Sequence, residues 1–156
     1  MPVKSIQELK SERRRDSRLL GLDLGSKTIG LALSDVTLTI ASPLETIMRS
    51  KFAKDAARLQ ALITEHDVGG LVIGLPVSMD GTEGPRCQST RDFTHNLFEK
   101  IDIDAAFWDE RWSTQAVERI LIGEADLTRK RRAQVVDRAA AAYILQGALD
   151  YLAIKN

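Results

Sequence analysis

Short apolar runs alternate with longer amphipathic stretches along this chain, a pattern typical of domains that combine strands with helices. The runs at 18–24 and 28–34 predict two strands, and the short turn at 25–27 favours an antiparallel hairpin between them. A third short strand is expected at about 44–48, after Ser42 and Pro43. The folded region is therefore predicted to begin with three consecutive strands.

From residue 52 onward the sequence alternates between helical and strand periodicity. Helices are predicted at about 52–66, 85–100, 114–122 and 131–151, and buried strands at about 71–74 and 104–109. We expect Gly69 and Gly70 to end the first of these helices. In the last helix, the predicted buried stripe places Asp137 at its flank and contains Val136, Ala140, Tyr143, Gly147 and Tyr151.

This order of elements predicts an α/β domain. A hairpin followed by alternating helices and strands places the first, fourth and fifth strands side by side in parallel. We therefore expect a five-stranded mixed sheet in the order 3-2-1-4-5, flanked by helices and spanning residues 18–152. Residues 1–17 are polar and are predicted to form a loose or briefly helical extension.

The composition indicates one ordinary globular domain. The chain has 156 residues, 44% of them hydrophobic and 28% charged. No apolar run approaches the roughly 20 residues needed to span a bilayer, and the N-terminus lacks the apolar core of a signal peptide. The single cysteine, Cys87, excludes an internal disulfide. A cytoplasmic protein without membrane partners is the default expectation.

Charge is balanced overall but unevenly distributed. The chain carries 22 basic and 22 acidic residues, yet residues 1–18 have a net charge of +3 and residues 128–138 one of +4. Such basic patches can bind a polyanion even on a neutral protein, although a solvated surface is the alternative for both. The second patch, with Arg129, Lys130, Arg131 and Arg132, adjoins Asp137 and is a candidate nucleic-acid contact.

Three acidic residues stand in largely apolar or small-residue surroundings. Asp23 lies in the first strand, Glu110 closes the last strand, and Asp137 lies in the last helix. A buried carboxylate costs several kcal/mol unless it is paired, hydrogen-bonded or bound to metal. Ligands of such sheets gather beyond the carboxyl ends of the parallel strands, where these residues can meet. Their oxygen ligands suit Mg²⁺ or Mn²⁺, and such a cluster serves phosphodiester hydrolysis.

Four segments of the sequence together resemble the YqgF/RuvX family of Holliday junction resolvase-like proteins, also described as nucleases of the 16S ribosomal RNA precursor. They lie in unbroken order and read Gly21-Leu22-Asp23-Leu24-Gly25, Gly74-Leu75-Pro76 with Asp80-Gly81-Thr82, Asp109-Glu110-Arg111, and the run from Val136 to Gln146. The resemblance implies a ribonuclease-H-like fold, dependence on Mg²⁺ or Mn²⁺, and a nucleic acid substrate. It also assigns Asp23, Glu110 and Asp137 as catalytic metal ligands.

The function implied by this resemblance is a metal-dependent nuclease, and processing of the 5′ end of pre-16S rRNA is the favoured role. The alternatives are a Holliday junction resolvase acting on branched DNA and a non-catalytic nucleic-acid-binding protein. The segment from Asp23 to Thr28 also resembles the first phosphate loop of actin-like ATPases, but 156 residues cannot hold the two domains that such enzymes need. The protein is expected to be a monomer or a homodimer.

Several residue assignments stay open at this point. Asp23 could instead cap the hairpin turn, and Asp137 could form a surface pair with Arg132 or Arg138. Strand alternation lets only one of Asp109 and Glu110 face the site, and the family resemblance favours Glu110. The remaining candidate contacts to phosphate, each with a plain surface or loop role as the alternative, are Lys27, Arg111, Ser78 and Thr82.

Overall fold

The computed structural model describes residues 2–78, 80–110 and 129–154, and within 129–137 it describes the helical backbone without the side chains. The predicted helix at 114–122 and the candidate residue Arg111 lie outside the described residues. The remaining predicted elements can be compared directly with the structure.

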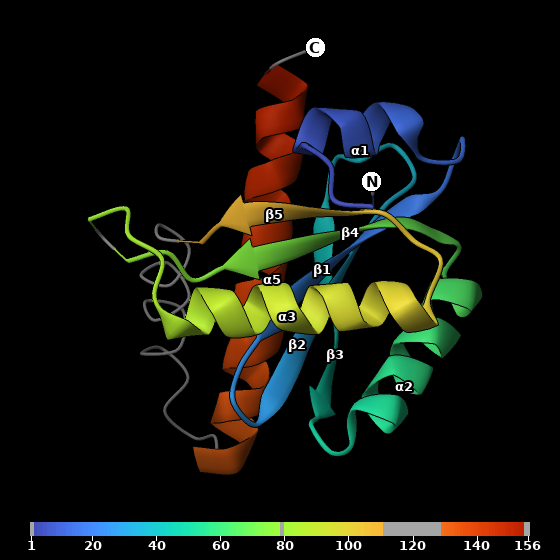
Figure 1. Ribbon diagram of the computed structural model, residues 1–156. Helices are drawn as coiled ribbons and strands as arrows, with labels where there is room; N and C mark the ends of the chain where they lie inside the picture. The colour runs from blue at the N-terminus through green and yellow to red at the C-terminus, as the bar shows by residue number, and fades with distance from the viewer. Residues whose placement is uncertain (1, 79, 111–128, 155–156) are drawn as a thin grey trace.

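A five-stranded sheet in the order β3-β2-β1-β4-β5 forms the centre of the molecule, which confirms the predicted topology (Figure 1). Strand β1 pairs antiparallel with β2, β2 pairs antiparallel with β3, and β1, β4 and β5 run parallel. Strands β1, β3, β4 and β5 therefore all end at one edge of the sheet, which we call the carboxyl edge. The strands are β1 (Arg18–Leu24), β2 (Thr28–Ser34), β3 (Ala41–Met48), β4 (Val68–Leu75) and β5 (Ala105–Asp109).

Strand β3 is longer than the sequence predicts, because it includes Ser42 and Pro43. A proline has no N–H to donate and is tolerated on an edge strand. Pro43 lies opposite Ala32, where the register between β2 and β3 shifts. The edge position of β3 thus accommodates the proline that the sequence analysis placed before the strand.

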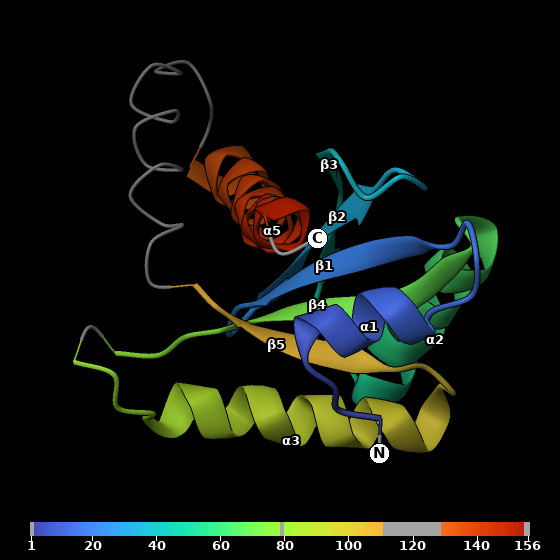
Figure 2. The same cartoon turned by 90° about the horizontal axis from the view of Figure 1, so that it is seen from above.

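Helices cover both faces of the sheet (Figure 2). Helices α2 (Phe52–Glu65) and α3 (Pro85–Lys100) pack on one face, and α1 (Ile6–Glu12) and α5 (Arg129–Ile154) pack on the other. Among the helices that the structure describes, none has both the length and the apolar character needed to cross a membrane.

Strand alternation assigns each buried residue to one of two cores. In β1, Leu20 and Leu22 belong to the core beneath α2 and α3, whereas Leu19 belongs to the core beneath α5. Because successive side chains point to opposite faces, Gly21 and Asp23 lie on the α5 side of the sheet. The same alternation places Ala106 and Trp108 of β5 on that side.

Gly69 and Gly70 do not end the second helix, so that prediction was wrong. Helix α2 already ends at Glu65, and Asp67 turns the chain with a left-handed backbone conformation, φ 52°. The two glycines are part of β4 and let other segments approach the sheet closely. A Cβ atom on Gly70 would lie 2.7 Å from Leu9 Cδ1 of α1.

The buried face of α5 also differs from the predicted stripe. The buried residues are Ala141, Ile144, Leu145, Ala148, Leu149 and Leu152, whereas Tyr143, Gly147 and Tyr151 are only half-buried. The helix lies so close to β1 that a Cβ atom on Gly21 would be 3.1 Å from the carbonyl oxygen of Ala141. Small side chains make this contact. The predicted stripe was built around the large residues Tyr143 and Tyr151, and it therefore lies to one side of the face that packs on the sheet.

The N-terminal segment packs on the domain. Helix α1 begins with a capping box formed by Ser5 and Glu8, and its Ile6 and Leu9 side chains are buried in the core beneath α5. Just before the helix, the Lys4 N–H donates to the carbonyl oxygen of Ala105 at 2.8 Å, which joins the segment to the outer side of β5. The segment thus partly covers the free edge of the sheet.

Candidate active site

Asp23 and Glu110 meet at the carboxyl edge of the sheet, and we call them the paired carboxylates. Asp23 lies one residue before the end of β1, and Glu110 directly follows β5. The Glu110 N–H donates to the carbonyl oxygen of Leu75 at 3.3 Å, which continues the pairing of β4 with β5. Both side chains are half-buried, and their carboxyl groups are within hydrogen-bonding reach of each other.

Gly74 of β4 makes room for this arrangement. A Cβ atom at position 74 would lie 2.5 Å from Oε2 of Glu110 and 2.5 Å from Cδ1 of Ile144 in α5. The missing side chain therefore allows the Glu110 carboxylate to lie over β4, between the sheet and α5. The position of this carboxylate depends on a glycine that is not itself chemically active.

The surroundings of Glu110 favour its protonated form. Burial is the largest cause that raises the pKa of its carboxyl group above the ordinary value, and Asp109 raises it further. The charge of Arg86 and the hydrogen-bonding contact with Asp23 lower this pKa but do not cancel the effect of burial. A cation bound between the two carboxyl groups would favour the ionised form instead.

The choice between Asp109 and Glu110 follows from the strand geometry. Asp109 is the last residue of β5 and pairs with Leu75, one position before Glu110. Alternation turns its side chain toward the face that carries α3, away from Asp23. The structure therefore brings Glu110, and not Asp109, together with Asp23.

The third predicted ligand, Asp137, belongs to α5, and its side chain lies outside the described residues. Its backbone precedes by one helical turn that of Ala141, which is buried against β1. Within the described part of the chain, no group of three or more acidic, histidine or cysteine side chains is arranged so that it could hold a metal ion. The described site thus consists of the paired carboxylates alone.

The paired carboxylates fit a hard divalent cation. They offer only oxygen donors, which suit Mg²⁺ and Mn²⁺ better than softer metals. They are also close enough to affect each other's protonation, and burial makes the ionised form of Glu110 costly. A cation held by Asp23 and Glu110 would stabilise the ionised form of both carboxyl groups.

The predicted contacts to phosphate are only partly described. Lys27 lies exposed in the turn between β1 and β2, and Ser78 and Thr82 lie exposed in the loop between β4 and α3. The Thr82 hydroxyl donates to Asp80 at 2.7 Å and is thus engaged within its own loop. Residue Arg111 and the side chains of Arg129, Lys130, Arg131 and Arg132 lie outside the described residues.

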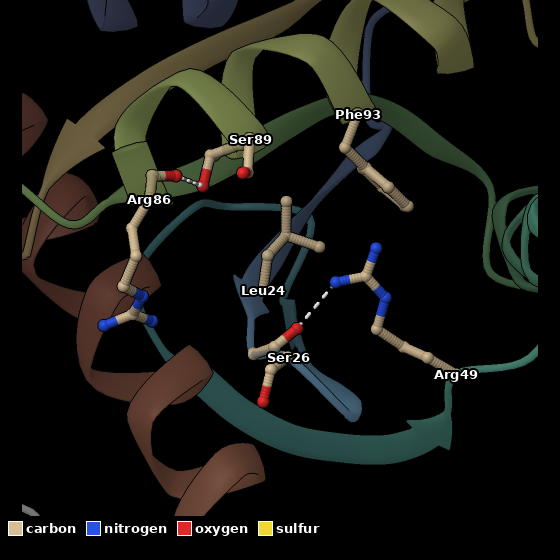
Figure 3. A pocket seen from close by; sticks show the side chains of 8 residues that line it. Leu24, Ser26, Arg49, Arg86, Ser89 and Phe93 are labelled. Atoms are coloured by element: carbon tan, nitrogen blue, oxygen red, sulfur yellow. Dashed lines mark hydrogen bonds between the residues drawn. The ribbon is translucent and has the colours of Figure 1, made fainter. Parts of the chain in front are cut away.

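The sequence analysis missed a second feature at the carboxyl edge, which we call the arginine cleft (Figure 3). It has a volume of about 450 Å³ and opens between the end of β1, the end of β3 and the first turns of α3. Its two arginines, Arg49 and Arg86, belong to no charge run and no periodic pattern, so little in the sequence indicates the cleft. The residues that matter in its lining are Leu24, Ser26, Arg49, Arg86, Ser89 and Phe93.

Comparison of the sequence with known proteins identifies close relatives. The profile of the RuvX family, described as "Holliday junction resolvase", matches residues 17–151. A protein of Paramagnetospirillum magneticum, named "Putative pre-16S rRNA nuclease", is 63% identical over 150 residues, which are 96% of each chain. A protein of Rhodospirillum rubrum with the same name is 58% identical over 152 residues, covering 97% of this chain and 94% of the relative.

Comparison of the fold identifies resolvases with little sequence similarity. The structure of T. thermophilus RuvC in complex with a Holliday junction substrate covers 86% of this chain with a TM-score of 0.53 and 14% identity. The Fowlpox virus resolvase in complex with junction DNA also covers 86%, with a TM-score of 0.53 and 12% identity. These similarities confirm the ribonuclease-H-like fold expected from the sequence.

Proposed function

The chain belongs to the RuvX family, and from this premise we propose that it is a metal-dependent nuclease that processes the 5′ end of the 16S ribosomal RNA precursor. The observation that carries the proposal is the meeting of Asp23 and Glu110 at the carboxyl edge of the sheet. Relatives that are 58% and 63% identical over nearly the whole chain bear the name of such a nuclease. The resolvases of similar fold are only 12–14% identical to this chain. We therefore favour RNA over junction DNA as the substrate.

In this proposal Asp23, Glu110 and Asp137 hold Mg²⁺ or Mn²⁺. Such a cation, when bound, lowers the pKa of a bound water and stabilises charge on the phosphate oxygens. Asp23 and Glu110 contribute oxygen ligands from β1 and β5, and α5 would bring Asp137 across them. Helical spacing supports this role, because position 137 falls on the same side of α5 as the buried Ala141 and Ile144.

The protein holds the two described carboxylates in place through backbone and packing contacts. Glu110 is fixed by its N–H bond to Leu75 and by the space above Gly74. Its raised pKa makes protonation of this carboxyl group in the metal-free site easier than for an ordinary glutamate. Protons should therefore compete with the cation for this carboxylate, and metal affinity should fall as the pH is lowered.

Basic residues would hold the substrate against this site. The side chains of Arg129 to Arg132 begin the helix that carries Asp137, and Lys27 adjoins the end of β1. We propose that they, with Arg111, Ser78 and Thr82, contact phosphates of the nucleic acid. Such contacts set affinity and register but carry no sequence information.

The test compares the purified protein with its Asp23→Asn variant on a pre-16S RNA fragment and on a four-way DNA junction, each with and without Mg²⁺. We expect magnesium-dependent cleavage of the RNA by the wild type and no cleavage by the variant, because the amide removes a charged ligand. Asp67→Asn is the matched control, since Asp67 pairs with Arg14 on the exposed surface at the opposite edge. Cleavage of the junction alone would transfer the assignment to DNA, and full activity of Asp23→Asn would refute the site.

A further inference from the structure

Among the described residues that line it, the arginine cleft has two cationic side chains and no carboxylate. Arg49 directly follows β3 and Arg86 lies in the first turn of α3, so two separate elements converge on it (Figure 3). Within the described part of the chain, neither guanidinium lies in a salt bridge with an acidic side chain. The cleft therefore presents positive charge beside a site that is itself acidic.

Two contacts fix the position of the Arg49 side chain at the cleft. One of its N–H groups donates to the carbonyl oxygen of Gly25 at 2.6 Å, and its guanidinium lies 5.3 Å from the centre of the Phe93 ring. A guanidinium has five N–H donors, and the described contacts occupy one of them. The side chain thus has a fixed position while most of its donors remain available, which lowers the entropic cost of binding a ligand.

Arg86 connects the cleft with the paired carboxylates. It lines the cleft, and its charge also acts on the carboxyl group of Glu110. In Figure 3 its side chain extends from α3 toward α5, on the opposite side of Ser26 from Arg49. A ligand bound in the cleft would therefore lie next to whatever is bound at Asp23 and Glu110.

We propose that the arginine cleft is a second phosphate subsite, which binds a phosphodiester of the substrate strand adjacent to the one held at the carboxylates. Arg49 and Arg86 supply charge-assisted hydrogen bonds to its oxygens, and the hydroxyls of Ser26 and Ser89 lie in the same lining. Leu24 and Phe93 provide an apolar wall for the attached sugar or base. This inference rests on the proposed nuclease function and specifies how the strand is positioned.

The open shape of the cleft favours a polymer over a free anion. Arg49, Arg86, Ser26 and Ser89 are all exposed, so a free phosphate would compete poorly with water there. A strand already held at the carboxylates brings its next phosphate to the cleft at a high effective concentration. The volume of about 450 Å³ also falls within the range of about 300–1,000 Å³ that is typical of ligand pockets.

The experiment measures binding of a labelled single-stranded pre-16S RNA fragment in EDTA, over a series of salt concentrations. We expect Arg49→Gln to weaken binding about tenfold and to reduce the slope of log K against log salt by about 0.7, the value for one phosphate contact to a single strand. Arg86→Gln should act in the same direction. Lys100→Gln is the matched control, because this exposed lysine lies in the last turn of α3, at the other end of the helix from Arg86, and it should leave both quantities unchanged.

A set of RNAs with one uncharged methylphosphonate at each position identifies the phosphate concerned. The wild type should lose affinity at one position beside the cleavage site, and Arg49→Gln should be insensitive to the modification there. Thermal unfolding checks that each variant is folded, and Arg49→Lys, which retains the charge, should keep the salt slope. If Arg49→Gln proves unfolded, Arg86→Gln is measured against the same methylphosphonate series.

The outcomes separate this inference from the proposed function. Unchanged affinity and slope in folded Arg49→Gln and Arg86→Gln, with the wild type still cleaving RNA, would overturn the phosphate subsite alone. Failure of the wild type both to bind and to cleave RNA would overturn the subsite together with the proposed function.

Discussion

The substitution Gly74→Ala tests whether the space above β4 sets the position of Glu110. The new Cβ atom would lie 2.5 Å from both Oε2 of Glu110 and Cδ1 of Ile144, whereas ordinary contacts begin at 3.4 Å. The distance from the new Cβ atom to these two atoms must therefore grow by about 0.9 Å, through a movement of the Glu110 carboxylate, of α5 or of both. Overpacking of this kind costs about 1–3 kcal/mol of folding free energy, which corresponds to a fall of about 2–12 °C in Tm for a domain of this size.

The expected loss of activity is larger than the loss of stability. Glu110 is the more easily displaced neighbour, and a misplacement of about 1 Å in a catalytic site can cost about 10²-fold in rate. Gly70→Ala is the control, because Gly70 lies on the same face of the same strand and its Cβ atom would be 2.7 Å from Leu9 Cδ1. It should lower Tm by a similar amount while leaving the activity of the folded fraction near that of the wild type.

The assay combines thermal unfolding with magnesium-dependent cleavage of the pre-16S RNA fragment, at a temperature where each variant is fully folded. Wild-type activity in Gly74→Ala would refute the reasoning, because it would show that the position of Glu110 does not depend on the space above β4. Equal loss of activity in both variants would also refute it, since the effect would then be general damage to the sheet.

Two further predictions concern stability. Burial raises the pKa of Glu110, so its contribution to folding stability is fully present below the unfolded-state pKa of about 4.5 and is lost as the pH rises through the higher folded-state value. Glu110→Gln should therefore raise Tm at neutral pH in EDTA and flatten the dependence of Tm on pH, and a lower Tm in melting curves from about pH 4 to pH 8 would contradict this. Leu9→Ala should cost about 2–5 kcal/mol in urea unfolding, because Leu9 of α1 is only 1% exposed in the core beneath α5. A loss below about 1 kcal/mol would mean that the N-terminal segment is not part of the cooperative unit.

The strands could be predicted because their signal is local. The runs at 18–24 and 28–34 match β1 and β2 as observed, and the short turn between them leaves only the antiparallel pairing. The alternating elements that follow then fix the parallel strands and the sheet order. Alternation at the end of β5 allowed only one of Asp109 and Glu110 to face the site, and the family resemblance supplied the choice of Glu110.

The errors arose where close packing decides the structure. Gly69 and Gly70 look like a helix stop, yet they lie within β4, where Gly69 leaves space for Ser17 and Gly70 leaves space for Leu9 of α1. The buried stripe of α5 was misplaced because small residues, and not tyrosines, face β1. Hydrophobic periodicity measures the size and polarity of side chains and contains no information about a partner that approaches from a distant segment.

The arginine cleft could not be predicted for a different reason. Arg49 and Arg86 are 37 positions apart and isolated among ordinary surface residues. Only the topology shows that β3 runs parallel to β1, so that Arg49 reaches the same edge as Leu24. A search of the residues that directly follow each strand ending at the carboxyl edge would have included Arg49, although not Arg86.

Glycines connect the fold with the chemistry of this protein. Gly21 lets α5 approach β1, and Gly74 lets Glu110 occupy the space between β4 and the same helix. This close approach removes water around Glu110, and the resulting burial is the main cause of its raised pKa. A larger residue at position 21 would move α5 outward and expose the carboxylate, which would bring its pKa closer to the ordinary value and weaken the pH dependence of metal binding. The distance between helix and sheet is thus as much a property of the proposed active site as the acidic residues themselves.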